Sequence, residues 1–70
     1  MHQARVIALF ASPAECRAAA SVLQERQFEH LRIHIPLPCM LWVDVLDPSS
    51  GAIVHILQGA NALDVVREAI

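Results

Sequence analysis

What this 70-residue sequence lacks excludes several classes of function. It contains no lysine, and seven acidic residues outnumber its five arginines. The formal net charge of −2 leaves no basic stripe for phosphates, which disfavours nucleic-acid binding. The longest apolar runs, such as residues 6–11, are too short to span a bilayer or to form the core of a signal peptide. We therefore expect a cytoplasmic protein with no membrane span.

The cysteine spacing and the missing catalytic motifs narrow the chemistry further. Cys16 and Cys39 lack the Cys-x-x-Cys spacing of zinc and redox sites, so we interpret them as small buried side chains. A disulfide between them requires Cα atoms within about 7 Å, which the sequence leaves open. Gly-x-Ser-x-Gly, Walker-type and His-Glu-x-x-His motifs are absent from the sequence. The sequence therefore predicts no catalytic residue, no metal ligand and no cofactor.

Hydrophobic residues are abundant for so short a chain. They make up 56% of the sequence, and a single domain of residues 1–70 is close to the lower size limit for a core without metal, disulfide or self-association. A small body has too much surface to bury all of its apolar side chains. We therefore expect part of the apolar surface to contact another chain. A homo-oligomer is predicted, with a dimer favoured, and a different protein partner is the alternative.

The N-terminal half predicts a strand, a helix and a second strand. Residues 5–10 are apolar on both alternating faces, which is typical of a strand covered on both sides. Ser12, Pro13 and Glu15 then supply an N-cap serine, a first-turn proline and a capping-box glutamate. The helix should run to about residue 27, and residues 28–35 should form a strand parallel to the first. The inward stripe of the helix is predicted to be Cys16, Ala19, Ala20 and Leu23.

The C-terminal half predicts a β-hairpin. Residues 40–47 and 52–58 are both largely apolar, and an Asp-Pro-Ser-Ser-Gly turn joins them. With residues 48–51 as the loop, Asp44 should oppose His55 on the face of the sheet that points away from the helices. The same register places Val45 opposite Val54 and Val43 opposite Ile56 on the core face.

The segments before and after the predicted hairpin complete the predicted order of elements. Pro36 has no N–H to donate, so it should end the second strand. Asn61 is predicted to cap a second helix that begins at Ala62 and turns Leu63, Val66 and Ile70 inward. The predicted order is β-α-β-β-β-α. The fold class is α+β, a two-layer sandwich of the ferredoxin-like type with both helices on one face of the sheet.

The outer face of the predicted sheet is the candidate site. Arg32 should oppose Asp44 and His34 should oppose Trp42, so that Arg32, Asp44 and His55 form one polar row. Aromatic and arginine side chains are enriched where proteins meet. We interpret the face as an interface between protomers. Its predicted contact residues are Phe28, Arg32, His34, Trp42, Asp44, Leu46, Ile53, His55 and Leu57.

Two alternatives use the same polar side chains. His30 and His34 are roughly 13 Å apart along one strand, so they cannot share a metal ion within a protomer. A small-ligand or metal sensor would therefore need a site formed between protomers. An enzyme would need the row of Arg32, Asp44 and His55 as an acid/base group in a cleft.

A resemblance to known families covers the first half of the chain. Residues 6–38 (V-I-A-L-F-A-S-P-A-E-C-R-A-A-A, then I-P-L-P) resemble the soluble part of one of the membrane-anchored components of the bacterial alternative complex III. More broadly, the chain looks like the ferredoxin-like and ACT-like small regulatory domains, whose order is β-α-β-β-α-β. ACT-like domains typically dimerise through their sheets and bind small ligands at the junction. The resemblance implies an assembly style and no ligand. From the open sheet face we expect a non-enzymatic regulatory or partner-binding module that self-associates through that face.

Overall fold

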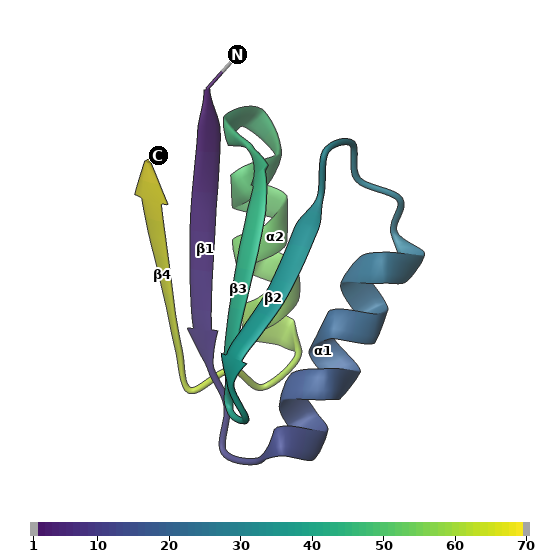
Figure 1. Cartoon of the computed structure of the whole chain (residues 1–70), viewed down its shortest axis with the longest axis vertical. Helices are drawn as coiled ribbons and strands as arrows, with labels where there is room; N and C mark the ends of the chain where they lie inside the picture. Colours follow the sequence, from purple (N-terminus) through teal and green to yellow (C-terminus); the bar gives the residue numbers. More distant parts are fainter. Residues whose placement is uncertain (1, 70) are drawn as a thin grey trace.

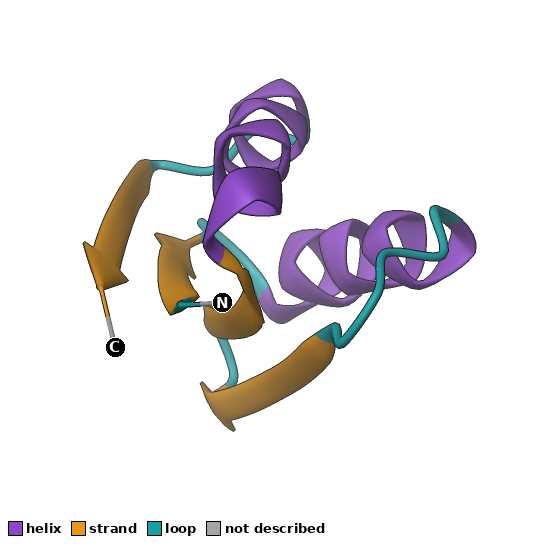
Figure 2. Ribbon diagram, turned by 90° about the horizontal axis from the view of Figure 1, so that it is seen from above, coloured by secondary structure: helices purple, strands orange, loops and turns teal. Residues whose placement is uncertain are grey.

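The computed structural model describes residues 2–69, which form one sheet with two helices. Along the chain the elements are β1 (Gln3–Leu9), α1 (Pro13–Glu25), β2 (Arg32–Leu37), β3 (Met40–Leu46), α2 (Asp47–Gly59) and β4 (Asp64–Ala69) (Figure 1). The sheet is antiparallel with strand order β2-β3-β1-β4. Both helices lie on the same face of the sheet (Figure 2). The fold is therefore of the α+β class, with β1 and β3 in the centre and β2 and β4 at the edges.

The start of α1 is the feature that local sequence predicts best. The Ser12 hydroxyl accepts a hydrogen bond from the Glu15 backbone N–H at 3.2 Å, and Pro13 stands in the first turn. The serine satisfies one of the unpaired N–H groups of a helix start and the proline lacks one, which confirms the predicted N-cap serine and first-turn proline. The buried residues of α1 are also the four predicted ones, Cys16, Ala19, Ala20 and Leu23.

The predicted second strand of the hairpin is wrong, because residues 52–58 lie inside α2. Pro48 and Asp47 suit a turn, but a first-turn proline and an N-terminal acid are also helix-start signals. Ile53 and Leu57 are four residues apart, a spacing that keeps side chains on one face of a strand and also on one face of a helix. Both side chains are completely buried in the core. His55, midway between them, is exposed. In a strand it would share the face of Ile53 and Leu57, whereas in a helix it points to a different side.

The predicted second helix is wrong as well, because residues 64–69 form strand β4 along β1. Asn61 does not cap a helix start. It follows the end of α2 with a φ of 70°, a left-handed conformation that asparagine tolerates better than most residues. The Leu63 backbone N–H donates to the Leu9 carbonyl at 2.7 Å and brings the chain alongside β1. Leu63 and Val66 are exposed, and Ile70 lies outside the described residues.

Strand β2 is shifted from its predicted position. It begins at Arg32 because residues 28–31 form a loop, within which His30 adopts a φ of 56°. Pro36 does not end the strand, which continues to Leu37. It lies at a register irregularity between His34 and Leu37. Proline is tolerated there because β2 is an edge strand. The predicted β-α-β-β-β-α order is thus replaced by β-α-β-β-α-β.

The hydrophobic core lies between the sheet and the two helices. One side of β1 and β3 is fully buried, while the residues between them are only partly covered. This alternation shows that β1 has one helix-covered face and one open face, whereas the sequence predicted cover on both sides. The buried core residues of these two strands are Ala4, Val6, Ala8, Leu41, Val43 and Val45. No element of residues 2–69 covers the opposite face of the sheet (Figure 2).

Candidate functional site: the open face of the sheet

The open face carries a row of four charged side chains that alternate in sign. The strand registers pair Arg5 with Glu68 on one side and with Asp44 on the other, and they pair Asp44 with Arg32. Directly opposed residues of neighbouring strands point to the same face of a sheet. From β4 through β1 and β3 to β2, the charged row is Glu68, Arg5, Asp44 and Arg32.

The two central members of the charged row form a bidentate ion pair. The Arg5 Nε donates to Asp44 Oδ1 at 2.8 Å, and Arg5 Nη2 donates to Oδ2 at 3.2 Å. The two side chains are 34% and 27% exposed, so water still reaches both. The hydrogen bond from Arg5 lowers the pKa of Asp44, and the nearby Arg32 adds to that effect. The same hydrogen bond raises the pKa of Arg5. The pair is therefore charged at neutral pH and fixes both groups in place.

We expect the Arg5–Asp44 pair to stabilise the fold less in acid. The pKa of Asp44 is lowered in the folded protein. The stabilisation that the charged carboxylate contributes is therefore fully present above the unfolded pKa of about 3.9, and it is lost as the pH falls through the lower folded pKa. Asp44→Asn should thus be less stable than the wild type at about pH 7, and the difference should shrink towards about pH 2. Urea unfolding at fixed protein concentration measures both values.

Asp64→Asn is the matched control for this prediction. Asp64 is an exposed carboxylate at the start of β4, and the described residues give it no ion pair. Removing its charge should change the free energy of unfolding less than Asp44→Asn does at neutral pH. An Asp44→Asn effect of equal size at both pH values would contradict the assigned role of the carboxylate charge.

Apolar side chains occupy the next two rows of the open face. The registers align Val66, Ile7, Trp42 and His34, and then Asp64, Leu9, Met40 and Leu37. Leu9, Leu37 and Val66 are 39%, 57% and 47% exposed. We call the apolar members of these rows the apolar patch. It consists of Ile7, Leu9, Leu37, Met40, Trp42 and Val66.

Trp42 is held at the centre of the open face by its neighbours. The guanidinium carbon of Arg5 lies 4.8 Å from the centroid of the indole ring, within the range of a cation–π interaction. The His34 ring lies 6.0 Å away on the other side. The indole Nε1 is buried and has no hydrogen-bond partner among residues 2–69. Trp42 thus presents a fixed aromatic surface, and its indole N–H has no hydrogen-bond acceptor among the described residues.

The structure brings together five of the nine predicted contact residues. The predicted oppositions of Arg32 with Asp44 and of His34 with Trp42 are confirmed. Leu46 is partly exposed and lies on the same face of β3, opposite Gln3. The sequence pattern missed the other members of the charged row and the apolar patch, because most of them lie on strands whose order it did not predict. The overlooked residues are Arg5, Ile7 and Leu9 on β1, Val66 and Glu68 on β4, Leu37 on β2 and Met40 on β3.

The remaining predicted contacts are not on the open face. Ile53 and Leu57 are core residues of α2 with no exposed surface, so their predicted placement is wrong. His55 is exposed on α2 and does not oppose Asp44, so the predicted row of Arg32, Asp44 and His55 does not form. Phe28 lies in the loop before β2 and packs against the core.

The structure contains little that supports metal or thiol chemistry in a protomer. Residues 2–69 include no group of three histidine, cysteine or acidic side chains able to hold one ion. Cys16 is buried, Cys39 is half-buried, and both are free thiols. Burial raises the pKa of Cys16, and the neighbouring Cys39 adds to the shift. Cys16 is therefore a weak nucleophile at neutral pH, because the thiolate is the reactive form.

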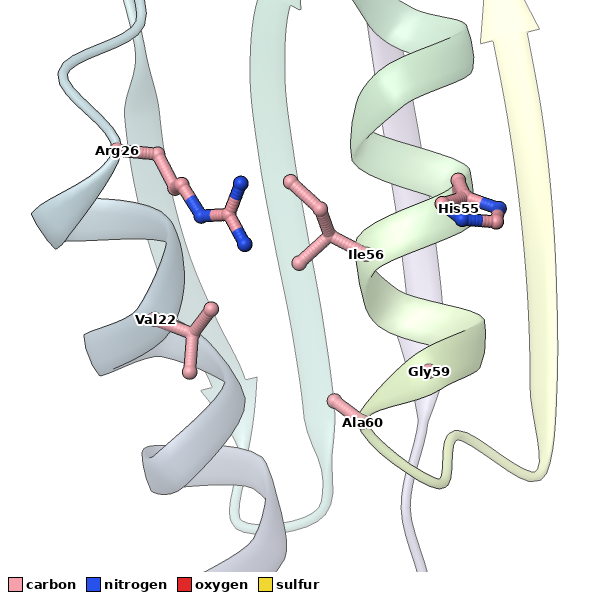
Figure 3. Close-up of a pocket in the computed structure, with 6 residues that line it drawn as sticks. All are labelled: Val22, Arg26, His55, Ile56, Gly59 and Ala60. Carbon is pink, nitrogen blue, oxygen red and sulfur yellow. The ribbon is translucent and has the colours of Figure 1, made fainter.

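A hollow lies on the helical layer, between α1 and α2. It has a volume of about 330 Å³ and is lined by Val22, Arg26, His55, Ile56, Gly59 and Ala60. Val22 and Arg26 project from α1 towards Ile56 and Ala60 of α2, while His55 stands on a different side of α2 (Figure 3). The hollow is a shallow groove with apolar walls and one arginine. It contains no pair of groups arranged for acid/base chemistry.

Comparisons with known proteins supply no family for this chain. It matches no family model, no curated protein and no solved structure. Within residues 2–69, neither helix is long and apolar enough to cross a membrane. The geometry of the open face is therefore the basis for a functional proposal.

Proposed function

We propose that this protein is a regulatory or partner-binding module that self-associates through the open face of its sheet. The observation that carries the proposal is the apolar patch, which lies beside the charged row on a face that no described element covers. Apolar side chains in contiguous rows are typical of a contact surface, whereas scattered ones are normal on any protein. The small size of the domain favours association as well, since burying the patch adds to a limited core.

The composition of the face also fits a protein interface. Interfaces are enriched in tryptophan, methionine and arginine, and their energetic centres are buried aromatic residues surrounded by less important contacts. Here Trp42 lies at the centre, with Met40 on the same strand and Arg5 over its ring. The face therefore combines an aromatic anchor with charged groups at its side.

Association by the β2 edge of the sheet is less favoured. Strand β2 is an edge strand that contains Pro36 and a register irregularity, two features by which proteins block unwanted strand pairing. The face of the sheet has no such protection. We therefore place the contact on the face and not on the edge.

The element order supports a ferredoxin-like assignment as part of this proposal. The order β-α-β-β-α-β is that of the ferredoxin-like split βαβ arrangement. This is also the order of the ACT-like regulatory domains that the sequence resembles, and those domains typically dimerise through their sheets. The likeness of residues 6–38 to a component of alternative complex III stays a resemblance and supplies no partner.

Trp42→Ala should weaken self-association about 30-fold or more, since loss of a central aromatic typically removes at least about 2 kcal/mol of binding energy. Sedimentation at several concentrations measures the dissociation constant, with the 7.7 kDa protomer as reference. Circular dichroism should show that the variant is folded, because Trp42 lies outside the core.

Val22→Ala is the control for the tryptophan variant. Val22 is 37% exposed on α1, in the layer opposite to the open face, so its loss should leave the dissociation constant unchanged. The proposal fails if the wild type is a monomer at every concentration. It also fails if Trp42→Ala associates as tightly as the wild type.

A further inference from the structure

The charged row is complementary to itself when the order of the strands is reversed. From β4 to β2 its signs are negative, positive, negative and positive, for Glu68, Arg5, Asp44 and Arg32. Reversing the order of the strands exchanges every cation for an anion. The row is thus complementary to a reversed copy of itself, with its centre between β1 and β3.

Two-fold symmetry allows two ways to stack such faces with their strands aligned. An axis that lies between the sheets and runs parallel to the strands keeps the height of each row and reverses the strand order. An axis that runs across the strands keeps the strand order and reverses the height. With the second axis, each charged residue of the row lies either against the same residue of the other copy or against an apolar row. Contacts between like charges and buried unpaired charges are both costly. Only the first axis pairs opposite charges.

We infer that the partner of the open face is a second copy, related by a two-fold axis parallel to the strands and passing between β1 and β3. This inference rests on the proposed function and adds the orientation and the residues that select it. Arg5 of each copy faces Asp44 of the other, and Glu68 of each copy faces Arg32 of the other. An isologous contact of this kind is the commonest arrangement of homodimers.

The same axis brings the apolar patches into register. Ile7 of one copy lies over Trp42 of the other, and Leu9 lies over Met40, because these pairs occupy β1 and β3 at the same height. Sheets packed face to face are rotated by about 30°, which displaces residues on the edge strands by only a few ångströms. Arginine and glutamate side chains are long enough to follow that displacement. On the two central strands the apolar contacts and the charged row are thus matched by one arrangement, while at the edges Val66 lies over His34 and Asp64 over Leu37.

The arrangement also determines how far apart the two His34 residues of a dimer lie. His34 is on the edge strand β2, so the axis places the two His34 residues of a dimer at opposite edges. Their separation is about three strand spacings, roughly 14 Å. This is too far for one metal ion to bridge. Charge pairs, and not a shared metal ion, therefore determine the specificity of the dimer.

Glu68 and Arg32 provide the test, because they cannot pair within one protomer. They lie on opposite edges of the sheet, again roughly 14 Å apart. Both are exposed, so replacing them leaves the core unchanged. Glu68→Arg alone places two arginines against each other twice in the dimer, and Arg32→Glu alone does the same with two glutamates. The double variant Glu68→Arg/Arg32→Glu restores both pairs with exchanged signs.

Each swap also places a like charge beside Arg5 or Asp44 within its own protomer, so the test is the coupling between the two changes. We expect each single variant to raise the dimer dissociation constant at least about tenfold. The double variant should bind at least about tenfold more tightly than the product of the two single effects predicts. Sedimentation at moderate ionic strength measures these constants, and circular dichroism checks that every variant is folded. If the wild type dimerises but the single variants do so equally well, this orientation is overturned and the proposed function stands. If the effects of the two single changes simply multiply in the double variant, the two residues are not coupled and the orientation is likewise overturned. A wild-type monomer overturns both.

Discussion

Leu57→Ala should destabilise the protein by about 2–5 kcal/mol, whereas His55→Ala should change its stability by no more than about 0.5 kcal/mol. Leu57 is a completely buried residue of α2 that belongs to the core, whereas His55 is exposed on the same helix. Removing the leucine side chain loses buried apolar surface and leaves a cavity. Small domains have total stabilities of only about 5–15 kcal/mol, so this single change should be near the limit of what the fold tolerates.

The comparison of these two residues tests the assignment of α2. In a hairpin, positions 55 and 57 would point to the same face of the sheet and respond alike, because side chains of a strand repeat every second residue. In a helix the two point to different sides. Urea unfolding at one protein concentration separates the cases. Equal and small effects at both positions would show that residues 52–58 are not a helix packed on the sheet.

Ala19→Leu should destabilise the protein by about 1–3 kcal/mol through overpacking. Ala19 is 1% exposed and faces the core from α1, within a stripe of small side chains that ends at Leu23. A larger side chain there pushes α1 away from its neighbours. Alanine and leucine are both strong helix formers, so the expected loss comes from packing and not from helix propensity.

Ala18→Leu is the matched control, because Ala18 is the neighbouring alanine on the exposed side of the same helix. Its free energy of unfolding should stay within about 0.5 kcal/mol of the wild type. The measurement is again the urea midpoint and slope. A stable Ala19→Leu variant would mean that the space between α1 and the sheet is larger than the structure shows.

Some elements could be predicted because one local signal decides them. The Ser12 cap and Pro13 fix the first turn of α1 through backbone N–H groups that lie close by in the chain. The buried stripe of α1 follows from helical spacing in a segment with clear ends. Strand β3 alternates over seven residues, and its pairing with Arg32 and His34 was predicted correctly.

The candidate site could be predicted only in part. Trp42 and Asp44 were assigned to the open face from their own strand, but their neighbours on β1 and β4 depend on strand order. Arg5 comes 39 residues before Asp44 in the chain, and its bond to that carboxylate exists only because β1 pairs with β3. Local sequence contains no signal for such a pairing.

Local residue patterns were enough to predict the α+β class, the start and inner face of α1, and the alternating outer residues of β3. The packed fold was needed to show that residues 47–59 form a helix and residues 64–69 a strand. Ile53 and Leu57 satisfy both periodicities, so the segment adopts the one that the rest of the core can cover. As a helix it packs on the sheet beside α1, and the chain that follows becomes the edge strand beside β1. The open face arises from that choice, because both helices then cover the same side of the sheet.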